Sequence, residues 1–349
     1  LNNDYSELRG GITYDWTWGN LSFLKEYIEW GENFSSSNIF SARSPSFPLI
    51  KLQLNPANWL DFNYFHGWLV SEVVDSSRSY FNSSGNYRSI FHEKNIAANM
   101  YSISTNKNLI FSFGNSIIYS DVGGAHVGYL FPFFFYKSLD HTLNHNIDNQ
   151  NAQMFFNFSC RSFKNLHFYS TLFIDEFKKS RINTDLENNF FSYKIGVRST
   201  NLIKDNVSSV IEFTRTTPMT YKHYNQTTTF ESNGYNLGHY LIDNSYELYY
   251  SFSFKPKYNL KFKSEYLYAF HADELEYSYE YEYNPVAIPI LSNKTWDNNT
   301  ISFSVEYQIF YNLFFSFKYQ YSNISGYANE VNSSQYYLDK FTPTFMQGI

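Results

Sequence analysis

The sequence is poor in the residues on which several protein classes depend. It has one cysteine, Cys160, so no internal disulfide can form, and we expect this residue to serve as a small apolar side chain. Charged residues make up only 17%, below the roughly 25% of typical soluble domains. The net charge is −6 and no basic patch occurs, which argues against a nucleic-acid-binding protein.

Long apolar segments are also missing. The longest apolar run, residues 129–136, is interrupted by Pro132, and no stretch approaches the ~18 apolar residues of a spanning helix. The mean hydropathy is −0.43. Aromatic residues are abundant, however, with 36 Phe and 33 Tyr, and tyrosine favours membrane–water interfaces. A membrane protein of this composition crosses the bilayer as a β-barrel.

A repeated hairpin dominates the chain, and its clearest copy is residues 246–268. Aromatic and apolar side chains alternate there with serine, lysine and glutamate, which is the period of a strand with two different faces. In a soluble sandwich the polar face would lie outside. In a membrane barrel the apolar face meets lipid and the polar face lines the lumen.

The loop lengths favour the membrane barrel. About fourteen strands are expected, most of them about ten residues long, as a tilted membrane strand requires. Short and long connections alternate strictly, as they do between periplasmic turns and extracellular loops. The expected strand pairs are 8–18 with 21–30, 49–54 with 60–72, 96–104 with 109–120, 154–160 with 166–175, 191–199 with 207–216, 245–254 with 260–269, and 300–309 with 313–322.

Five short turns share an Asn-Leu-x-Phe signature. Asparagine tolerates left-handed backbone, so it is expected to close the turn, and the Leu and Phe that follow begin the same outward face. The five turns start at Asn20, Asn108, Asn165, Asn259 and Asn312. We therefore predict one antiparallel up-and-down transmembrane β-barrel of about 14–18 strands in the bacterial outer membrane, spanning residues 1–349 as a single domain.

The polar faces of these strands predict a charged lumen. Mixed signs indicate cross-strand pairing or a wet interior, whereas an ion-selective pore would carry one sign. The charges expected to face the lumen are Lys194, Arg198, Glu212, Glu247, Lys261, Lys263, Glu265, Glu306 and Lys318.

Three loop segments stand out. The first is apolar and is expected either to fold into the barrel mouth as a plug or to contact a partner; it comprises Leu130, Phe131, Pro132, Phe133, Phe134, Phe135 and Tyr136. His141, His145 and Asp148 follow at a helical metal spacing, but their Asn-rich surroundings do not predict a helix, and we expect no metal and no cofactor. Residues 274–283 alternate Glu and Tyr, typical of the exposed top of a strand pair.

Catalytic signatures are missing from the sequence. It contains no G-x-S-x-G, no H-E-x-x-H and no P-loop, and the spacing of its Ser, His and Asp residues singles out no triad. We expect a protein that is not an enzyme.

Several short blocks resemble the Wzi-type capsule-assembly outer-membrane proteins, in the form found in Bacteroidetes-like bacteria. The blocks are residues 24–31 (LKEYIEWG), 44–52 (SPSFPLIKL), 128–136 (GYLFPFFFY), 218–223 (PMTYKH), 236–239 (NLGH) and 244–248 (NSYEL). That family has a periplasmic helical part before its barrel. This chain starts at Leu1 without it or a signal peptide, so we expect a mature or trimmed sequence with incomplete ends.

The resemblance implies a barrel of up to 18 strands that holds or organises surface polysaccharide without catalysis. Arg43, Tyr221, His223 and His239 are then the ligand candidates, with Arg and His donating to uronate or hydroxyl groups and Tyr stacking on a sugar ring. The expected partners are outer-membrane lipid, surface polysaccharide and other outer-membrane proteins. Two alternatives remain open, a diffusion porin and a structural subunit of a secretion or motility complex.

Overall fold

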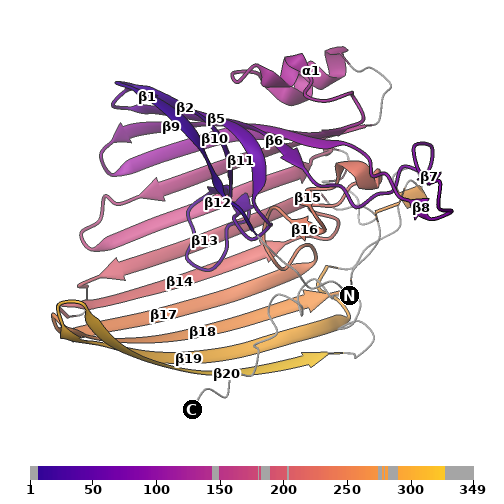
Figure 1. The fold of residues 1–349 in the computed structure, drawn as a ribbon. Helices are drawn as coiled ribbons and strands as arrows, with labels where there is room; N and C mark the ends of the chain where they lie inside the picture. The colour runs from indigo at the N-terminus through magenta and orange to yellow at the C-terminus, as the bar shows by residue number, and fades with distance from the viewer. Residues whose placement is uncertain are drawn as a thin grey trace.

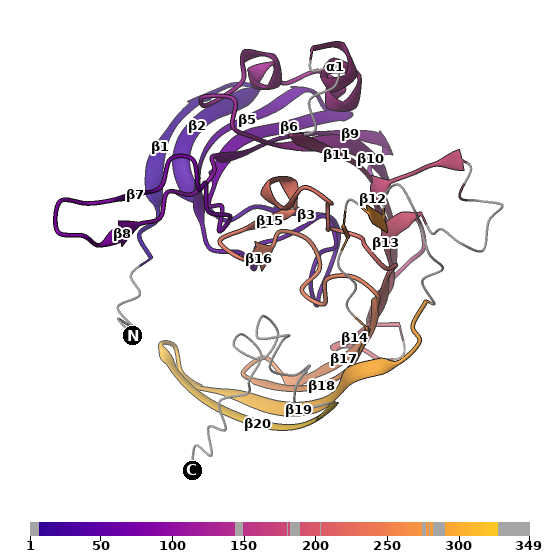
Figure 2. The same ribbon diagram turned by 90° about the vertical axis from the view of Figure 1, so that its right-hand side faces the viewer.

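A single antiparallel sheet of fourteen strands forms the body of the protein. The computed structural model describes residues 7–143, 149–179, 181, 189–202, 204–273, 277–278, 280–281 and 290–326. The strands run in chain order and the sheet curls into a barrel (Figures 1 and 2). They are β1 (Gly10–Trp16), β2 (Gly19–Glu26), β5 (Phe47–Ala57), β6 (Leu60–Leu69), β9 (Lys94–Asn106), β10 (Leu109–Ser120), β11 (Gln150–Cys160), β12 (Leu166–Glu176), β13 (Phe190–Thr200), β14 (Val207–Thr216), β17 (Ser245–Lys257), β18 (Leu260–Ala272), β19 (Lys294–Phe310) and β20 (Leu313–Gly326).

This order confirms the predicted up-and-down barrel and all seven predicted strand pairs. Every neighbouring pair in the sheet is antiparallel, and short turns alternate with long loops. β1 and β20 are the two edges, and they are not hydrogen-bonded to each other in the described part of the chain. Among the described residues, no helix is long and apolar enough to cross a membrane.

The strand register separates an apolar outer face from a polar inner face. On β17 and β18, for example, Leu248 pairs with Tyr268 and Tyr250 with Tyr266 on the outer face, while Ser251 pairs with Glu265 on the inner face. Exposed apolar side chains recur along the outer face, including Ile12, Phe23, Phe111, Ile195, Ile211, Ile301 and Phe317. A soluble sandwich would bury these groups, so the wall is built to face lipid.

Two long loops fold back into the barrel and form a plug, which we define as residues 27–46 and 217–244. The first contains the strand pair β3 (Glu29–Trp30) and β4 (Phe40–Ser41), and the second contains η3 (Gln226–Thr228), β15 (Glu231–Ser232) and β16 (Tyr235–Asn236). Figure 2, seen along the barrel, shows β3, β15 and β16 inside the wall. Rings from both loops pack together: the Phe40 and Phe230 centroids are 5.3 Å apart.

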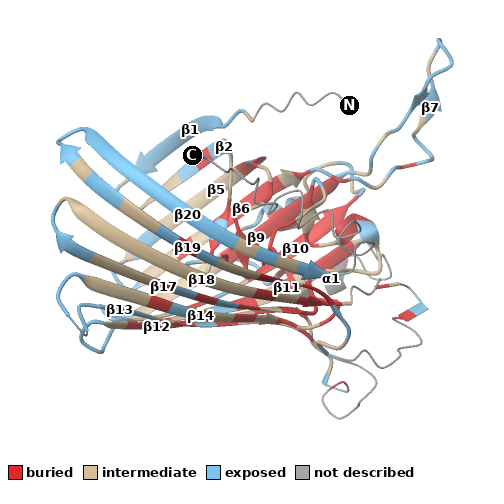
Figure 3. Ribbon diagram, turned by 90° about the horizontal axis from the view of Figure 1, so that it is seen from below, coloured by how far each residue is buried: buried red, intermediate tan, exposed pale blue. Residues whose placement is uncertain are grey.

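The plug and the inner wall share the largest hydrophobic core. Trp30 and Phe40 of the plug pack against Phe65 and Phe155, which point inward from β6 and β11. Buried residues gather on the long-loop half of the barrel, whereas the half near the short turns is mostly exposed or intermediate (Figure 3). The extracellular half of the lumen is therefore filled with protein.

Two other long loops stay outside the lumen. Residues 70–93 project from the barrel as a hairpin, with β7 (Tyr80–Phe81) paired to β8 (Tyr87–Arg88) (Figure 3). Residues 121–143 carry η1 (Val127–Leu130) and α1 (Tyr136–Leu143), and Figure 2 shows α1 beyond the outer face of the wall.

The turn asparagines do not all act as expected. Of the five, only Asn165 has a positive φ, at 63°. Three instead accept a lateral backbone hydrogen bond from the neighbouring hairpin: Asn108 from Arg161, Asn165 from Thr200 and Asn259 from Gln308. The signature therefore marks where adjacent hairpins are joined at the periplasmic rim more than it marks left-handed backbone.

Candidate functional site at the extracellular rim

Wall carboxylates hold the plug in place. Glu212 of β14 is 1% exposed and accepts hydrogen bonds from the backbone amides of Phe34 and Ser35, each at 2.8 Å. The Tyr169 hydroxyl donates to the same carboxylate at 2.8 Å, and Lys194 Nζ lies 3.6 Å away. A buried carboxylate with charged and amide partners is a strong, directional attachment, so Glu212 anchors the first plug loop.

The second plug loop has anchors of the same kind. Asp175 of β12 accepts from the Tyr221 amide at 2.6 Å, and the Tyr240 hydroxyl donates to Glu247 of β17. Inside the loop, Asp243 accepts from the Met219 amide at 2.9 Å. These carboxylates position the surface of the second plug loop near the barrel rim.

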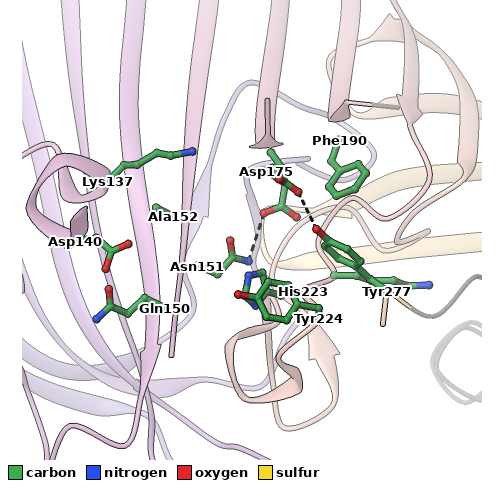
Figure 4. Close-up of a pocket in the computed structure, with 12 residues that line it drawn as sticks. Lys137, Asp140, Gln150, Asn151, Ala152, Asp175, Phe190, His223, Tyr224 and Tyr277 are labelled. Carbon is green, nitrogen blue, oxygen red and sulfur yellow. Dashed lines mark hydrogen bonds between the residues drawn. The ribbon is translucent and has the colours of Figure 1, made fainter. Parts of the chain in front are cut away.

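A cleft lies at the extracellular rim, between α1 and the second plug loop (Figure 4). Its volume is about 160 Å³. The lining residues come from the helix, the strand ends and the plug: Lys137, Asp140, Gln150, Asn151, Ala152, Asp175, Glu176, Phe190, Lys222, His223, Tyr224 and Tyr277. The cleft is therefore built jointly by the helix, the strand ends and the plug.

Aromatic rings form one side of this cleft. The Phe190 and Tyr277 centroids are 5.3 Å apart and nearly perpendicular, and the Tyr224 and Tyr277 centroids are 6.0 Å apart. The His223 ring lies 4.3 Å from the Tyr224 ring. The Tyr277 hydroxyl donates to Glu176 at 3.0 Å, which fixes the tyrosine.

The side-chain amide of Gln150 is a further polar group in the cleft. Gln150 is 8% exposed and lines the cleft, yet among the described residues neither its side-chain nitrogen nor its side-chain oxygen has a hydrogen-bond partner. Burying an amide without partners is costly. A ligand in the cleft that both donates and accepts would remove this cost.

The charges around the cleft are balanced. Glu176 pairs with Lys178 at 2.9 Å and with Arg181 at 3.2 Å, and Lys222 pairs with Asp243 at 3.0 Å. Glu176 and Lys222 therefore already have charged partners, while Lys137, Asp140 and Asp175 also line the cleft. Aromatic faces beside a free amide suit the ring and hydroxyl groups of a sugar.

The four predicted ligand residues do not meet at one site. His223 lines the rim cleft, and its Nδ1 lies 2.8 Å from the Thr228 hydroxyl. Arg43 lies in the lumen, 4.5 Å above the Tyr240 ring. Tyr221 and His239 differ from the prediction, since they are 3% and 0% exposed inside the plug.

These two buried residues have structural contacts instead. The Tyr221 hydroxyl donates to the backbone oxygen of Asn38 at 2.6 Å and so joins the two plug loops. His239 Nε2 lies 3.7 Å from Glu247, and burial lowers the pKa of His239. Burial likewise raises the pKa of Tyr221.

The register places all nine predicted lumen charges on the inner face. Lys194, Glu212 and Glu247 are buried against the plug, and Arg198 lies 5.3 Å from the Phe34 ring. The other five line the part of the lumen along β18–β20. There Lys261 pairs with Glu306 at 3.3 Å and Lys263 with Glu265 at 2.6 Å, while Lys318 borders a cavity.

The described part of the lumen contains two sizeable cavities. One, of about 550 Å³, lies below the plug near the periplasmic turns and is lined by Asn20, Glu29, Trp30, Gly31, Glu32, Asn33, Gln53, Asn55, Asp61, Phe62, Asn63, Met100, Ser102, Ile110, Ser112 and Asn157. The other, of about 210 Å³, lies between Arg43 and Tyr240 of the plug and the inner face of β17–β20. The larger cavity is mainly polar, as in a wet lumen.

Residues 130–136 do not fold into the barrel mouth. They pack on the outer face of the wall, where the Phe133 and Phe62 ring centroids are 4.8 Å apart and the Tyr64 hydroxyl donates to the Tyr129 backbone oxygen at 3.0 Å. The plug prediction for this segment is therefore wrong. The extracellular half of the lumen is already filled by the other two loops, and the outer wall offers hydrogen-bonding groups to this one.

The metal spacing noted in the sequence lies mostly outside the described residues. His145 and Asp148 fall there, as does most of the Glu/Tyr-rich segment 274–283. Among the residues the structure does describe, no cluster of three His, Cys, Asp or Glu side chains is placed to hold a metal ion.

Comparison with known proteins relates the chain to others by fold. No protein family and no curated protein matches the sequence. The structure is similar to Wzi, an outer-membrane protein involved in group 1 capsule assembly in Escherichia coli and a carbohydrate-binding β-barrel, with a TM-score of 0.62 at 12% identity. That match covers 90% of this chain but 66% of Wzi, just under two thirds of its length.

A second similar structure is OccD3 (OpdP) of Pseudomonas aeruginosa, with a TM-score of 0.48, 10% identity and coverage of 88% of this chain and 70% of OccD3. The similarity to Wzi shows that the fold is that of an outer-membrane β-barrel. Together with the exposed apolar outer face, this locates the chain in the bacterial outer membrane.

Sequence reasoning missed Gln150 as a site residue. Gln150 begins a strand, so it does not stand out locally. A signal existed in the aromatic and amide content of residues 217–239. The partner surface on α1 and β11, however, comes from a distant part of the chain.

Proposed function

We propose that this barrel binds surface polysaccharide at its extracellular rim without catalysing a reaction on it. The observation that carries the proposal is the buried, unpartnered amide of Gln150 in a cleft walled by Tyr224, Tyr277 and Phe190. Sugar rings stack on aromatic faces and exchange hydrogen bonds with amides. The plug supports a binding role over transport, because it fills the extracellular half of the lumen.

The cleft is small compared with the roughly 300–1,000 Å³ of pockets for drug-sized ligands. It fits one sugar unit of a longer chain, with neighbouring units lying over the rim. Recognition of a single unit is expected to be weak, and repeated units on one polymer would raise the overall avidity.

Binding of the purified barrel to polysaccharide extracted from its source cells tests the proposal. Replacing Gln150 with Leu removes both hydrogen-bonding atoms and is expected to weaken binding roughly two- to tenfold, as for the loss of one or two hydrogen bonds. Tyr224→Ala removes a stacking face and should weaken binding further. Gln226→Leu changes an exposed glutamine of the same loop and is the matched control.

Two results would contradict the proposal. If the wild-type barrel shows no affinity for the polysaccharide, the function is wrong. If Q150L and Y224A bind as tightly as wild type and Q226L, the cleft is not the site.

A diffusion porin is the second candidate, and the two lumen cavities favour it. The cavity below the plug, of about 550 Å³, and the cavity beside it, of about 210 Å³, leave part of the lumen unfilled by protein. Steady open channels in planar bilayers would support this reading. The plugged binding protein instead predicts brief, small or no conductance steps.

A further inference from the structure

Two asparagines occupy the apolar outer face of the wall. Asn99 of β9 and Asn115 of β10 pair directly across the strands, on the same side as the neighbouring pair Tyr101 and Phe113. Their side chains would face acyl chains on a bare barrel. Amide groups without partners are strongly disfavoured in hydrocarbon.

Residues 126–143, which we call the strap, cover these two amides from outside. Asn99 Nδ2 donates to the backbone oxygens of Pro132 at 2.9 Å and Phe134 at 2.8 Å. Asn115 Oδ1 accepts from the backbone amide of Tyr136 at 2.9 Å. The wall amides and the strap carbonyls therefore satisfy one another.

Further contacts turn the strap backbone toward the wall. The Tyr101 hydroxyl donates to the backbone oxygen of Phe133 at 3.2 Å, and the backbone oxygen of Phe135 accepts from the Ser138 amide at 3.2 Å, where α1 begins. All four carbonyls from residue 132 to residue 135 thus have partners. Irregular backbone is tolerated at membrane depth where its polar groups face protein in this way.

The phenylalanine rings of the strap remain partly exposed, although Phe133 also contacts Phe62 of the wall. Phe131, Phe133, Phe134 and Phe135 are 42–49% exposed, and no charged residue occurs between Val127 and Tyr136. On the wall, the strap reaches from Tyr119 down to the level of Phe113. The six residue steps between Phe113 and Tyr119 correspond to about 20 Å along a strand, a large part of an apolar belt about 25 Å tall.

We propose that the strap is a membrane-embedded part of the barrel surface, with these phenylalanines inserted among the acyl chains of the outer leaflet. We expect lipid to cover the strap because the strap continues the lipid-facing surface of the wall. The exposed residues Phe111 and Phe113 of the same outer face adjoin it. The loop enters the membrane along the outside of the barrel. A second copy of this chain or a partner protein would be the alternative occupant.

Depth-dependent fluorescence quenching tests this proposal. Each variant carries one cysteine in a Cys160→Ser background, labelled with a small fluorophore and reconstituted in phospholipid vesicles. Phe133→Cys and Phe135→Cys probe the strap, so the test survives if one of them fails to fold. Phe111→Cys on the outer wall is the lipid-facing control, and Phe81→Cys on the projecting hairpin is the aqueous control.

Lipids brominated along their acyl chains should quench the strap labels as strongly as the label at position 111, and aqueous iodide should quench only the label at position 81. Quenching of the strap labels by iodide would place the strap in water and overturn the proposal. Shielding from both quenchers would also overturn it, since protein would then cover the rings. Capture of a protein by a photo-reactive residue at position 133 in intact cells would do the same.

Discussion

Replacing Glu212 is expected to release the first plug loop. Its carboxylate accepts two backbone hydrogen bonds from residues 34 and 35, and it lies 3.6 Å from the fully buried Lys194. Glu212→Ala removes all of these and leaves the buried Lys194 ammonium with Glu247 as its remaining nearby carboxylate. Breaking such a buried pair costs about 3–5 kcal/mol.

The substitution is expected to destabilise the attachment of the plug more than the barrel itself, because the backbone hydrogen bonds of the wall do not depend on Glu212. A shift of 3 kcal/mol changes a closed-to-open ratio by roughly a hundredfold. A plug that is open in about one molecule in a thousand would then be open in about one in ten. We expect trypsin to cleave E212A at Arg43 much faster than wild type.

Glu306→Gln is the matched control. Glu306 also faces the lumen and pairs with Lys261 at 3.3 Å, but both side chains are about half exposed, and such pairs contribute only about 0–1 kcal/mol. Cleavage rates and single-channel conductance should rise in E212A and stay unchanged in E306Q. Equal protection of Arg43 in wild type and E212A would refute the idea that Glu212 anchors the plug.

Three further predictions follow from single contacts. Burial lowers the pKa of His239, so below the ordinary pKa of about 6.5 the unfolded chain binds more protons than the folded protein. Stability therefore falls as the pH drops through that range. Thermal melts should show this loss of stability, and His239→Gln should reduce it. In Gly196→Ala, the added Cβ meets the Tyr169 ring at 2.1 Å and should cost about 1–3 kcal/mol, whereas Gly10→Ala, with open space around it, should leave the melting temperature unchanged. Asn99→Leu removes the hydrogen bonds that its side chain donates to the backbone oxygens of Pro132 and Phe134, costs about 1–3 kcal/mol and should make the strap susceptible to protease. Unchanged protease resistance of the strap would contradict this prediction.

The wall could be predicted from the sequence because its information is local. Alternation within residues 246–268 fixes the two faces of a strand, and short turns fix which strands pair. The same alternation puts Glu212 on the inner face. It does not reveal whether that carboxylate meets water or the backbone of a loop almost 180 residues away.

The positions of the long loops depend on contacts between distant segments. The aromatic segment 130–136 suits a plug and an outer strap equally well by composition. The distinguishing signal lies elsewhere, in Asn99 and Asn115, two amides on otherwise apolar outward faces. Tyr221 and His239 show the reverse problem, since residue types suited to binding sugars also suit the interior of a polar plug.

The central claim is that the Phe/Tyr/Leu side of these strands faces lipid while the charged side surrounds a plugged lumen. A nitroxide scan along residues 247–252 of β17 in proteoliposomes tests it most directly. The account predicts that labels at Leu248, Tyr250 and Phe252 collide with oxygen dissolved in the bilayer, while labels at Glu247, Tyr249 and Ser251 do not. Equal behaviour at all six positions, or folding of the unlabelled chain as a detergent-free soluble monomer, would contradict it.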